Sequence, residues 1–202
     1  DQLETATQGI AAMAAGDLVI NGIAIGASSG VDDAFSNIEQ DKSAIAKVAA
    51  INAAKDQTGV EAVVNNTTVS GGTGFDASFG SGNITINGVD ITIAAFAGLT
   101  PEANLESIVN VINESSGQTG VVASFNGNRD SGITLTAEDG RNIHITDTSS
   151  GDLVEDAGLA RATTFSGSFT LISADGSSIA LDTTTGDIAN AGLAVGEFSG
   201  SN

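Results

Sequence analysis

One short segment occurs twice in this chain, as residues 20–23 (Ile-Asn-Gly-Ile) and as residues 86–89 (Ile-Asn-Gly-Val). Each copy is followed by an Ile-Asn pair, at 51 and 112, and by a Thr-Gly-Val-x-Ala run that begins at 58 and 119. The offset is 66 residues for the first segment and 61 for the other two, so the first copy carries five extra residues between its strand and its helix. Duplicated units usually extend a scaffold, whereas a catalytic constellation usually occurs once. The repeat therefore predicts a structural role.

The first copy predicts a strand, helix, strand unit over about residues 17–68. Asn-Gly is the dipeptide best suited to a type I′ turn, so residues 17–25 are expected to form two short strands hinged there. We expect a helix that starts near Asp41 or Ser43 and is ended by Thr58-Gly59, followed by a returning strand over 60–64. The apolar stripe of this helix comprises Ile38, Ile45, Val48, Ala49 and Asn52, with Lys47 and Lys55 outside it.

The second copy predicts the same order of elements with a better-marked helix. Two strands are expected over 83–93 and a returning strand over 120–125. Thr100 is suited to the N-cap and Pro101 to the first helical position. The apolar positions repeat at helical spacing, at Leu105, Ile108, Val109 and Ile112.

Residues 133–145 and 169–181 form a second repeated pattern, offset by 36 residues. Both alternate apolar and polar residues around an Asp-Gly pair, which predicts a hairpin in each. Apolar residues at helical spacing before Gly16 predict a short helix or a helical approach segment over 1–15. The Gly-rich stretch 70–82 predicts a loop or a domain boundary.

These elements predict an α+β protein of two duplicated subdomains, each a small antiparallel-rich sheet with hairpins packed against one amphipathic helix. Because 133–145 directly follows the second unit, we expect 169–181 to close the first. The predicted domains are a proximal one of residues 1–70 plus 161–202 and an inserted distal one of residues 71–160. Sheet contacts between 169–181 and the second unit would contradict this nesting.

The composition limits the classes of function. Six Lys plus Arg against 25 Asp plus Glu give a formal net charge of −19, which repels nucleic acid and anionic membrane surfaces. No apolar run approaches the roughly 20 residues that span a bilayer. The chain has no Cys, Trp or Tyr, so thiolate chemistry and the strongest aromatic anchors are missing. The acidity and the small polar residues favour an extracellular protein, although the first residues do not resemble a signal peptide.

The candidate chemical residues are few. His144 is the single histidine, and its position between two isoleucines of a strand predicts a solvent-facing ring. Paired carboxylates can hold calcium or hydrolyse glycosides, but none here matches the calcium loop D-x-[DN]-x-[DN]-G. We therefore predict no catalytic, cofactor-binding or metal-binding residue. The carboxylate clusters considered are Asp32 with Asp33, Glu138 with Asp139, and Asp147 with Asp152, Glu155 and Asp156.

Other recurring residues also have structural explanations. Glycines at 71, 72, 74, 80 and 82 do not form the G-x-G-x-x-G of dinucleotide sites. The repeated Asn-Gly pairs are interpreted as turn residues alone. N-glycosylation tripeptides are common by chance; here they begin at Asn65, Asn66, Asn83 and Asn113.

The repeated segments resemble the variable central region of bacterial flagellin, which carries the flagellin IN motif. The resemblance rests on residues 18–23 (Leu-Val-Ile-Asn-Gly-Ile), 46–54 (Ala-Lys-Val-Ala-Ala-Ile-Asn-Ala-Ala) and 58–62 (Thr-Gly-Val-Glu-Ala), and on their second copies. Residues 133–145 are similar to the Leu-Thr-x-x-Asp-Gly hairpin that follows the motif in this family. The likeness covers about 17–68 and 83–147. Nothing matches the long helical terminal segments through which flagellin polymerises.

The resemblance implies a non-catalytic structural protein, the surface-exposed outer domains of a flagellar filament subunit. It implies an extracellular location on the bacterial flagellum, a role in motility and O-linked glycans on exposed Ser or Thr. The implied partners are other flagellin subunits, bound through terminal segments that this sequence lacks, so we expect an excised fragment that is monomeric by itself. Hook-filament junction and cap proteins share the motif and remain open alternatives, as do a surface adhesin module and an enzyme.

Overall fold

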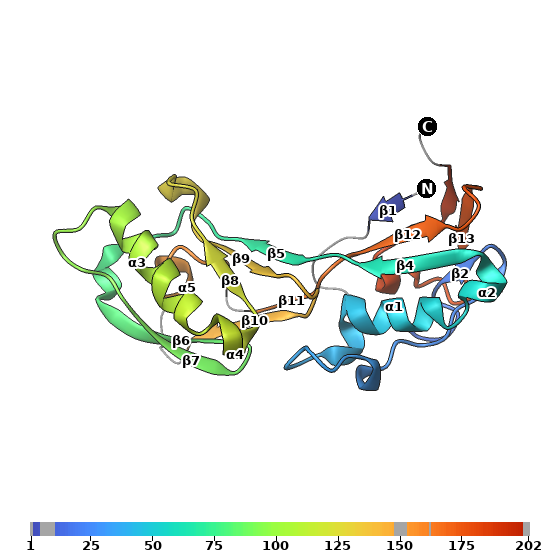
Figure 1. Cartoon of the computed structure of the whole chain (residues 1–202), viewed down its shortest axis with the longest axis horizontal. Coiled ribbons are helices and arrows are strands. Elements are labelled where there is room, and N and C mark those ends of the chain that lie inside the picture. Colours follow the sequence, from blue (N-terminus) through green and yellow to red (C-terminus); the bar gives the residue numbers. More distant parts are fainter. Residues whose placement is uncertain (1, 5–10, 148–152, 162, 200–202) are drawn as a thin grey trace. The chain divides into compact units, whose positions relative to one another are not determined.

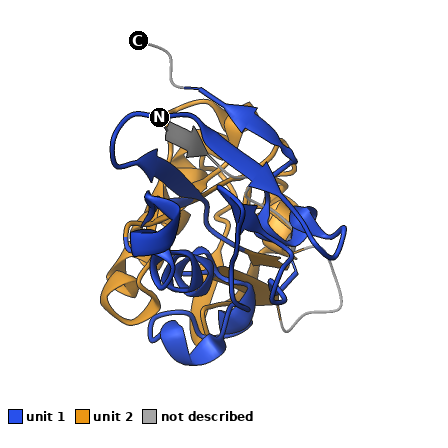
Figure 2. Ribbon diagram, turned by 90° about the vertical axis from the view of Figure 1, so that its right-hand side faces the viewer, with its two compact units in different colours: residues 1–67, 139–142, 166–202 blue, residues 68–138, 143–165 orange. Residues whose placement is uncertain are grey.

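A computed structural model describes residues 2–4, 11–147, 153–161 and 163–199. Helices alternate with antiparallel strands along the chain, which confirms the predicted α+β class. The chain divides into two compact units, coloured separately in Figure 2. Unit 1 comprises residues 1–67, 139–142 and 166–202, and unit 2 comprises residues 68–138 and 143–165.

Unit 1 contains a four-stranded sheet in the order β14-β13-β2-β3. Its strands are β2 (Val19–Ile20), β3 (Ile23–Ala24), β13 (Ile179–Asp182) and β14 (Gly196–Phe198). The turn between β2 and β3 has φ of 50° at Asn21 and 83° at Gly22, as a type I′ turn requires. The predicted hairpin over 17–25 is therefore confirmed.

A three-stranded sheet in the order β1-β12-β4 completes unit 1. Its strands are β1 (Gln2–Glu4), β12 (Phe169–Ser173) and β4 (Val60–Val64), and every pair is antiparallel. The helix predicted over 1–15 is wrong at both described parts, because 2–4 form a strand and 11–15 contain no helix. Residues 5–10 lie outside the described residues. In β1 the backbone finds its partners on the edge of β12, which spacing along the sequence does not reveal.

The helices of unit 1 include the predicted one. They are α1 (Ala44–Asn52), α2 (Lys55–Thr58) and the 3₁₀ turns η1 (Gly30–Asp32), η2 (Gln40–Lys42) and η5 (Ile188–Ala191). Ser43 caps α1, since its hydroxyl accepts a hydrogen bond from the Ala46 N–H at 3.1 Å. The predicted face of this helix is wrong in part: Val48 is buried as predicted, but Ile45 is only half-buried, and Lys47, expected outside the stripe, is buried. α1 contacts β4, η1 and η2, so more than one side of it is covered.

Unit 2 contains sheets in the orders β11-β10-β6-β7 and β5-β9-β8. The first consists of β6 (Ser81–Ile86), β7 (Val89–Ala94), β10 (Ile143–Asp147) and β11 (Thr164–Phe165). The second consists of β5 (Thr67–Ser70), β8 (Val122–Ser124) and β9 (Thr134–Ala137). The strands predicted over 83–93 form the β6–β7 hairpin, with positive φ at Asn87 and Gly88.

The long helix of unit 2 is α3 (Pro101–Glu114), and it packs against β7 and β8 (Figure 1). The predicted cap is confirmed: Thr100 accepts from the Ala103 N–H at 3.2 Å, and Pro101 occupies the first position. The other helical turns of this unit are η3 (Ala77–Phe79), α4 (Ser116–Thr119), η4 (Arg129–Ser131) and α5 (Leu153–Asp156).

The two segments predicted as hairpins are not hairpins. β9 and β10 belong to different sheets of unit 2, and β12 and β13 belong to different sheets of unit 1. The Asp-Gly pairs at 139–140 and 175–176 still form turns, with φ of 76° at both glycines. Each turn therefore carries the chain from one sheet to another, because the alternating residues pair with other strands. The strands of 169–181 pair with β1, β4, β2 and β14, all of them in unit 1.

Each unit buries its own apolar core. In unit 2, Leu105, Ile108 and Ile112 of α3 pack with residues of both sheets. In unit 1, Ala44, Val48 and Ile51 of α1 have the corresponding place. Among the described residues, every helix is too short or too polar to cross a bilayer.

Candidate functional site

The asparagine of the first Ile-Asn-Gly segment connects three parts of unit 1. Its Nδ2 donates to the carbonyl of Thr58 at the end of α2, at 2.8 Å. Its Oδ1 accepts from the Ala180 N–H of β13 at 2.9 Å, and its own N–H donates to the Ala180 carbonyl at 2.9 Å. Turn geometry alone therefore does not explain Asn21, because its amide also holds the hairpin to a helix end and to the next strand.

Asn87 makes the same set of contacts in unit 2. Its Nδ2 donates to the Thr119 carbonyl at 2.9 Å, and its Oδ1 accepts from the His144 N–H at 2.8 Å. Its N–H donates to the His144 carbonyl at 2.9 Å. Asn87 is buried whereas Asn21 is exposed. These two side chains, which we call the turn asparagines, perform the same structural task in both units.

A second pair, the helix asparagines, fastens each long helix to its returning strand. Asn52 Nδ2 donates to the Ala62 carbonyl at 2.9 Å, and the Ala62 N–H donates to Asn52 Oδ1 at 2.8 Å. Asn113 and Ala123 form the matching bonds at 3.0 Å and 2.7 Å. A side-chain amide used in this way replaces a strand partner for one backbone residue. The sequence signal for this role was the recurrence of Ile-Asn itself.

The threonine before each returning strand completes the pattern. Thr58 Oγ1 accepts from the Val60 N–H, and Thr119 Oγ1 accepts from the Val121 N–H, both at 3.1 Å. The glycine after each threonine has φ of 69° or 70°, a left-handed conformation that glycine adopts without strain. The repeated asparagines and threonines are thus engaged with backbone groups.

Lys47 is a buried cation that the sequence did not predict. It is 1 % exposed, and its ammonium has no hydrogen-bond partner among the described residues. Burial lowers the pKa of Lys47 to about 8, and Asp41 opposes this shift. A lysine whose pKa lies near neutrality can act as a base or nucleophile, but this one is enclosed. We therefore find in Lys47 a cost to folding and no accessible reaction site.

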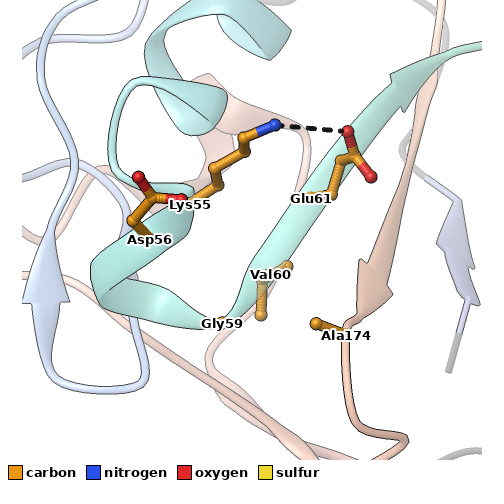
Figure 3. A pocket seen from close by; sticks show the side chains of 6 residues that line it. All are labelled: Lys55, Asp56, Gly59, Val60, Glu61 and Ala174. Carbon is orange, nitrogen blue, oxygen red and sulfur yellow. Dashed lines mark ion pairs between the residues drawn. The ribbon is translucent and has the colours of Figure 1, made fainter.

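A shallow pocket of unit 1 lies where α2 meets β4 (Figure 3). It has a volume of about 230 Å³, below the roughly 300–1,000 Å³ typical of ligand pockets. Lys55 Nζ lies 3.8 Å from Glu61 Oε1, and both side chains are more than half exposed. No hydroxyl, thiol or imidazole lines it, so its chemistry is that of a solvated ion pair. The lining residues are Lys55, Asp56, Gly59, Val60, Glu61 and Ala174.

His144 lies on the face of β10 opposite Ile143 and Ile145, as alternation predicts, and both isoleucines are fully buried. The prediction of a solvent-facing ring is therefore only partly confirmed, because His144 is half-buried, and its partner across the β10–β11 pair is Thr164. Its Nδ1 lies 2.8 Å from Thr164 Oγ1. The described hydrogen-bond partner of the His144 ring is therefore an uncharged hydroxyl, and no carboxylate bonds to the ring among the described hydrogen bonds.

The candidate carboxylates occupy separate structural positions. Asp33 is buried; burial raises its pKa, but hydrogen bonds from Ser36, Ser43 and Phe35 lower it more. Asp139 binds the Arg141 guanidinium.

The remaining carboxylates do not assemble a site either. Asp32 is exposed, and Asp147, Glu155 and Asp156 are partly buried. Asp152 lies outside the described residues. In the part of the chain that the structure describes, no three His, Cys, Asp or Glu side chains are grouped as a metal site would need.

The N-glycosylation tripeptides differ in accessibility. Asn113 is a helix asparagine, so its amide is occupied. Asn65 donates to Ser168 and accepts from Thr170, which also occupies its amide. Asn66 is exposed.

Comparison with protein-family models and with characterised proteins finds no match to this chain.

Proposed function

We propose that this chain is the outer portion of a flagellar filament subunit and that its function is structural. The observation that carries the proposal is the recurrence of the turn and helix asparagines, whose side chains make the same backbone contacts in both units. These are the residues on which the resemblance to the flagellin IN motif rests. Because these side chains hydrogen-bond the segments of each unit to one another, their role fits a structural protein better than an enzyme.

The charge of the chain supports the same role. A formal net charge of −19 keeps neighbouring outer domains soluble and apart when many copies are held along one filament. In this proposal the contacts that build the filament are made by terminal helical segments of the whole subunit, and glycans are O-linked to exposed Ser or Thr. The protein is extracellular, and its work is spacing and hydration of the filament surface.

Immunogold electron microscopy of cells that carry the gene tests the proposal. Antibodies raised against the purified chain are expected to label filaments along their whole length, and deletion of the gene is expected to remove filaments and swimming. Label confined to the hook-filament boundary or to the filament tip would assign the chain to a junction or cap protein instead. Label on the cell body with normal filaments in the deletion strain would overturn the proposal in favour of a surface adhesin.

A further inference from the structure

Three Asn-Gly pairs occur in the chain, at 21–22, 87–88 and 126–127, and the fold treats the third differently. The first two contain the turn asparagines, in which Nδ2 and Oδ1 are each bonded to the backbone of another segment. Asn126 lies in the exposed loop between β8 and η4. We propose that Asn126 is a site of spontaneous covalent modification, at which the asparagine is converted to aspartate and to its β-linked isomer.

The loop leaves the reacting atoms of Asn126 accessible. Its Oδ1 accepts a single hydrogen bond, from the Asn128 N–H at 2.9 Å within the same loop. Its Nδ2 makes no hydrogen bond among those described. A Cβ placed on Gly127 would meet nothing within 4 Å, as at Gly22, so no other segment packs against the α-carbon of the glycine. Asn126 and its two neighbours on the C-terminal side are all exposed.

The chemistry needs no other reactant than water and a base. After the Gly127 N–H loses its proton to solvent base, the nitrogen attacks Asn126 Cγ and forms a new C–N bond. The Cγ–Nδ2 bond breaks, and Nδ2 leaves as ammonia after taking up a proton, which gives a cyclic imide. Water then opens the imide at either carbonyl, producing aspartate or β-linked aspartate. The modification adds one negative charge to the formal −19.

The turn asparagines contain the same dipeptide but are held away from this path. Cγ must rotate toward the following nitrogen, and in Asn21 and Asn87 that rotation breaks bonds to two other segments. We expect Asn126 to react about tenfold faster than either turn asparagine, because rotation breaks two bonds to other segments in the slower cases and only the local Asn128 bond in Asn126. Without the fold, the three pairs differ only in their flanking residues.

Peptide mapping by mass spectrometry tests this directly. The purified chain is aged at mildly alkaline pH, and conversion at each asparagine is followed with fragmentation that distinguishes β-linked aspartate. A parallel sample in concentrated urea is expected to lose the preference, with the three sites within about threefold of each other once the fastening bonds are absent. Equal rates in the folded chain, or a preference that persists unchanged in urea, would overturn the proposal.

Two variants of the loop serve as controls. Asn126→Gln is expected to abolish ammonia release at this position in the folded chain, because the longer side chain does not form the five-membered imide readily. Asn126→Asp is expected to coelute with the α-linked aged product on anion exchange. Undiminished ammonia release from the folded Asn126→Gln variant would place the reaction elsewhere and contradict the assignment.

Discussion

The long helices of the two units differ most at one position. Residues 105, 108 and 112 of α3 correspond, at the offset of 61, to residues 44, 47 and 51 of α1. Both sets are buried, but Ile108 of unit 2 is matched by Lys47 of unit 1. Positions that correspond in the sequence repeat therefore enclose an isoleucine in unit 2 and, in unit 1, an ammonium without a hydrogen-bond partner among the described residues. The turn and helix asparagines make the same contacts in both units, so these contacts form even where the core contains a residue that destabilises the fold.

The largest expected effect comes from placing the unfavourable residue in the other unit. Ile108→Lys is expected to destabilise unit 2 by about 4 kcal/mol, because an unpaired charge is moved into an apolar core. Ile108→Met, which keeps the position apolar, is expected to cost less than about 1.5 kcal/mol. Urea unfolding of both variants measures the difference. Similar losses for the two substitutions would show that shape and not charge governs this position.

The reverse substitution is expected to stabilise unit 1. With the pKa of Lys47 lowered from 10.5 to about 8, the ammonium costs about 3 kcal/mol at neutral pH, so Lys47→Met is expected to recover most of this amount. Lys55→Met, at an exposed lysine, is expected to change stability by less than about 0.5 kcal/mol. Urea midpoints for the transition of unit 1 provide the measurement.

The pH dependence of Lys47 gives an independent check with a definite sign. Between about pH 8 and 10.5 the unfolded chain keeps the proton on Lys47 and the folded chain releases it, so stability is expected to rise through this window and to level off above it. The chain has no Tyr or Cys, so few other groups titrate there. Lys47→Met is expected to remove the slope. A slope of the opposite sign would place a partner beside the ammonium.

The face of α1 was available from the sequence, but not from α1 alone. Its own apolar residues predicted a stripe through Ile45 and Val48. Val48 is buried, but Ile45 is only half-buried, and the other buried positions of the helix are Ala44, Ala46, Lys47 and Ile51. Shifting the better-marked stripe of α3 back by 61 residues gives 44, 47, 48 and 51, which are all buried, and leaves out only the buried Ala46. Alanine-rich helices have weak periodicity, since alanine fits on either side, whereas the repeat carries the register from the stronger copy.

The sequence predicted the strands and turns of 133–145 and 169–181 but not their partners. Alternation and Asp-Gly describe a strand, a turn and a strand, and this description is the same for a hairpin and for a corner between two sheets. The partner is decided by distant segments: Leu171 pairs with Ala62, and Leu181 pairs with Ile20. The contacts of the turn asparagines were missed for the same reason, because they are made with backbone atoms far along the chain.

The helix asparagines provide the next largest test of the two units. Asn52→Ala and Asn113→Ala are each expected to cost about 2 kcal/mol, because each removes two hydrogen bonds to a strand residue. Similar losses are expected in the two units despite their different cores, since the bonds are the same. Asn110→Ala, at an exposed position of α3, is the control and is expected to be nearly neutral. A large loss in only one unit would break the equivalence.

Substitution of the turn asparagines is expected to destabilise the two units by slightly different amounts. Asn87 is buried and Asn21 is exposed, so water replaces the lost bonds of Asn21→Ala more easily than those of Asn87→Ala. We expect the loss in unit 2 to exceed that in unit 1 by about 1 kcal/mol. Replacement of each asparagine by glycine, which also accepts positive φ, separates the cost of the amide from that of the turn. Equal losses would mean that exposure does not matter here.

The smallest expected difference lies between the matching turns at Asp139 and Asp175. The Ser177 and Ser173 hydrogen bonds lower the pKa of Asp175 to about 2; burial raises the pKa of Asp139, but bonds from Arg141 lower it more. Both carboxylates have depressed pKa values in the folded chain, so their contribution is present above the unfolded value of 3.8 and is lost as the pH falls through the folded one.

Asp139→Asn is expected to cost at most about 1 kcal/mol at neutral pH, because a partly shielded pair with Arg141 is lost. The loss for Asp175→Asn is expected to be smaller, since its carboxylate is surrounded by water and its serine bonds survive in part with an amide. Urea midpoints at neutral and at acidic pH, together with carboxyl titration by NMR, measure both. If the Asp175→Asn variant were instead the less stable of the two, the serine hydrogen bonds at Asp175 would contribute more to stability than the Arg141 guanidinium does at Asp139.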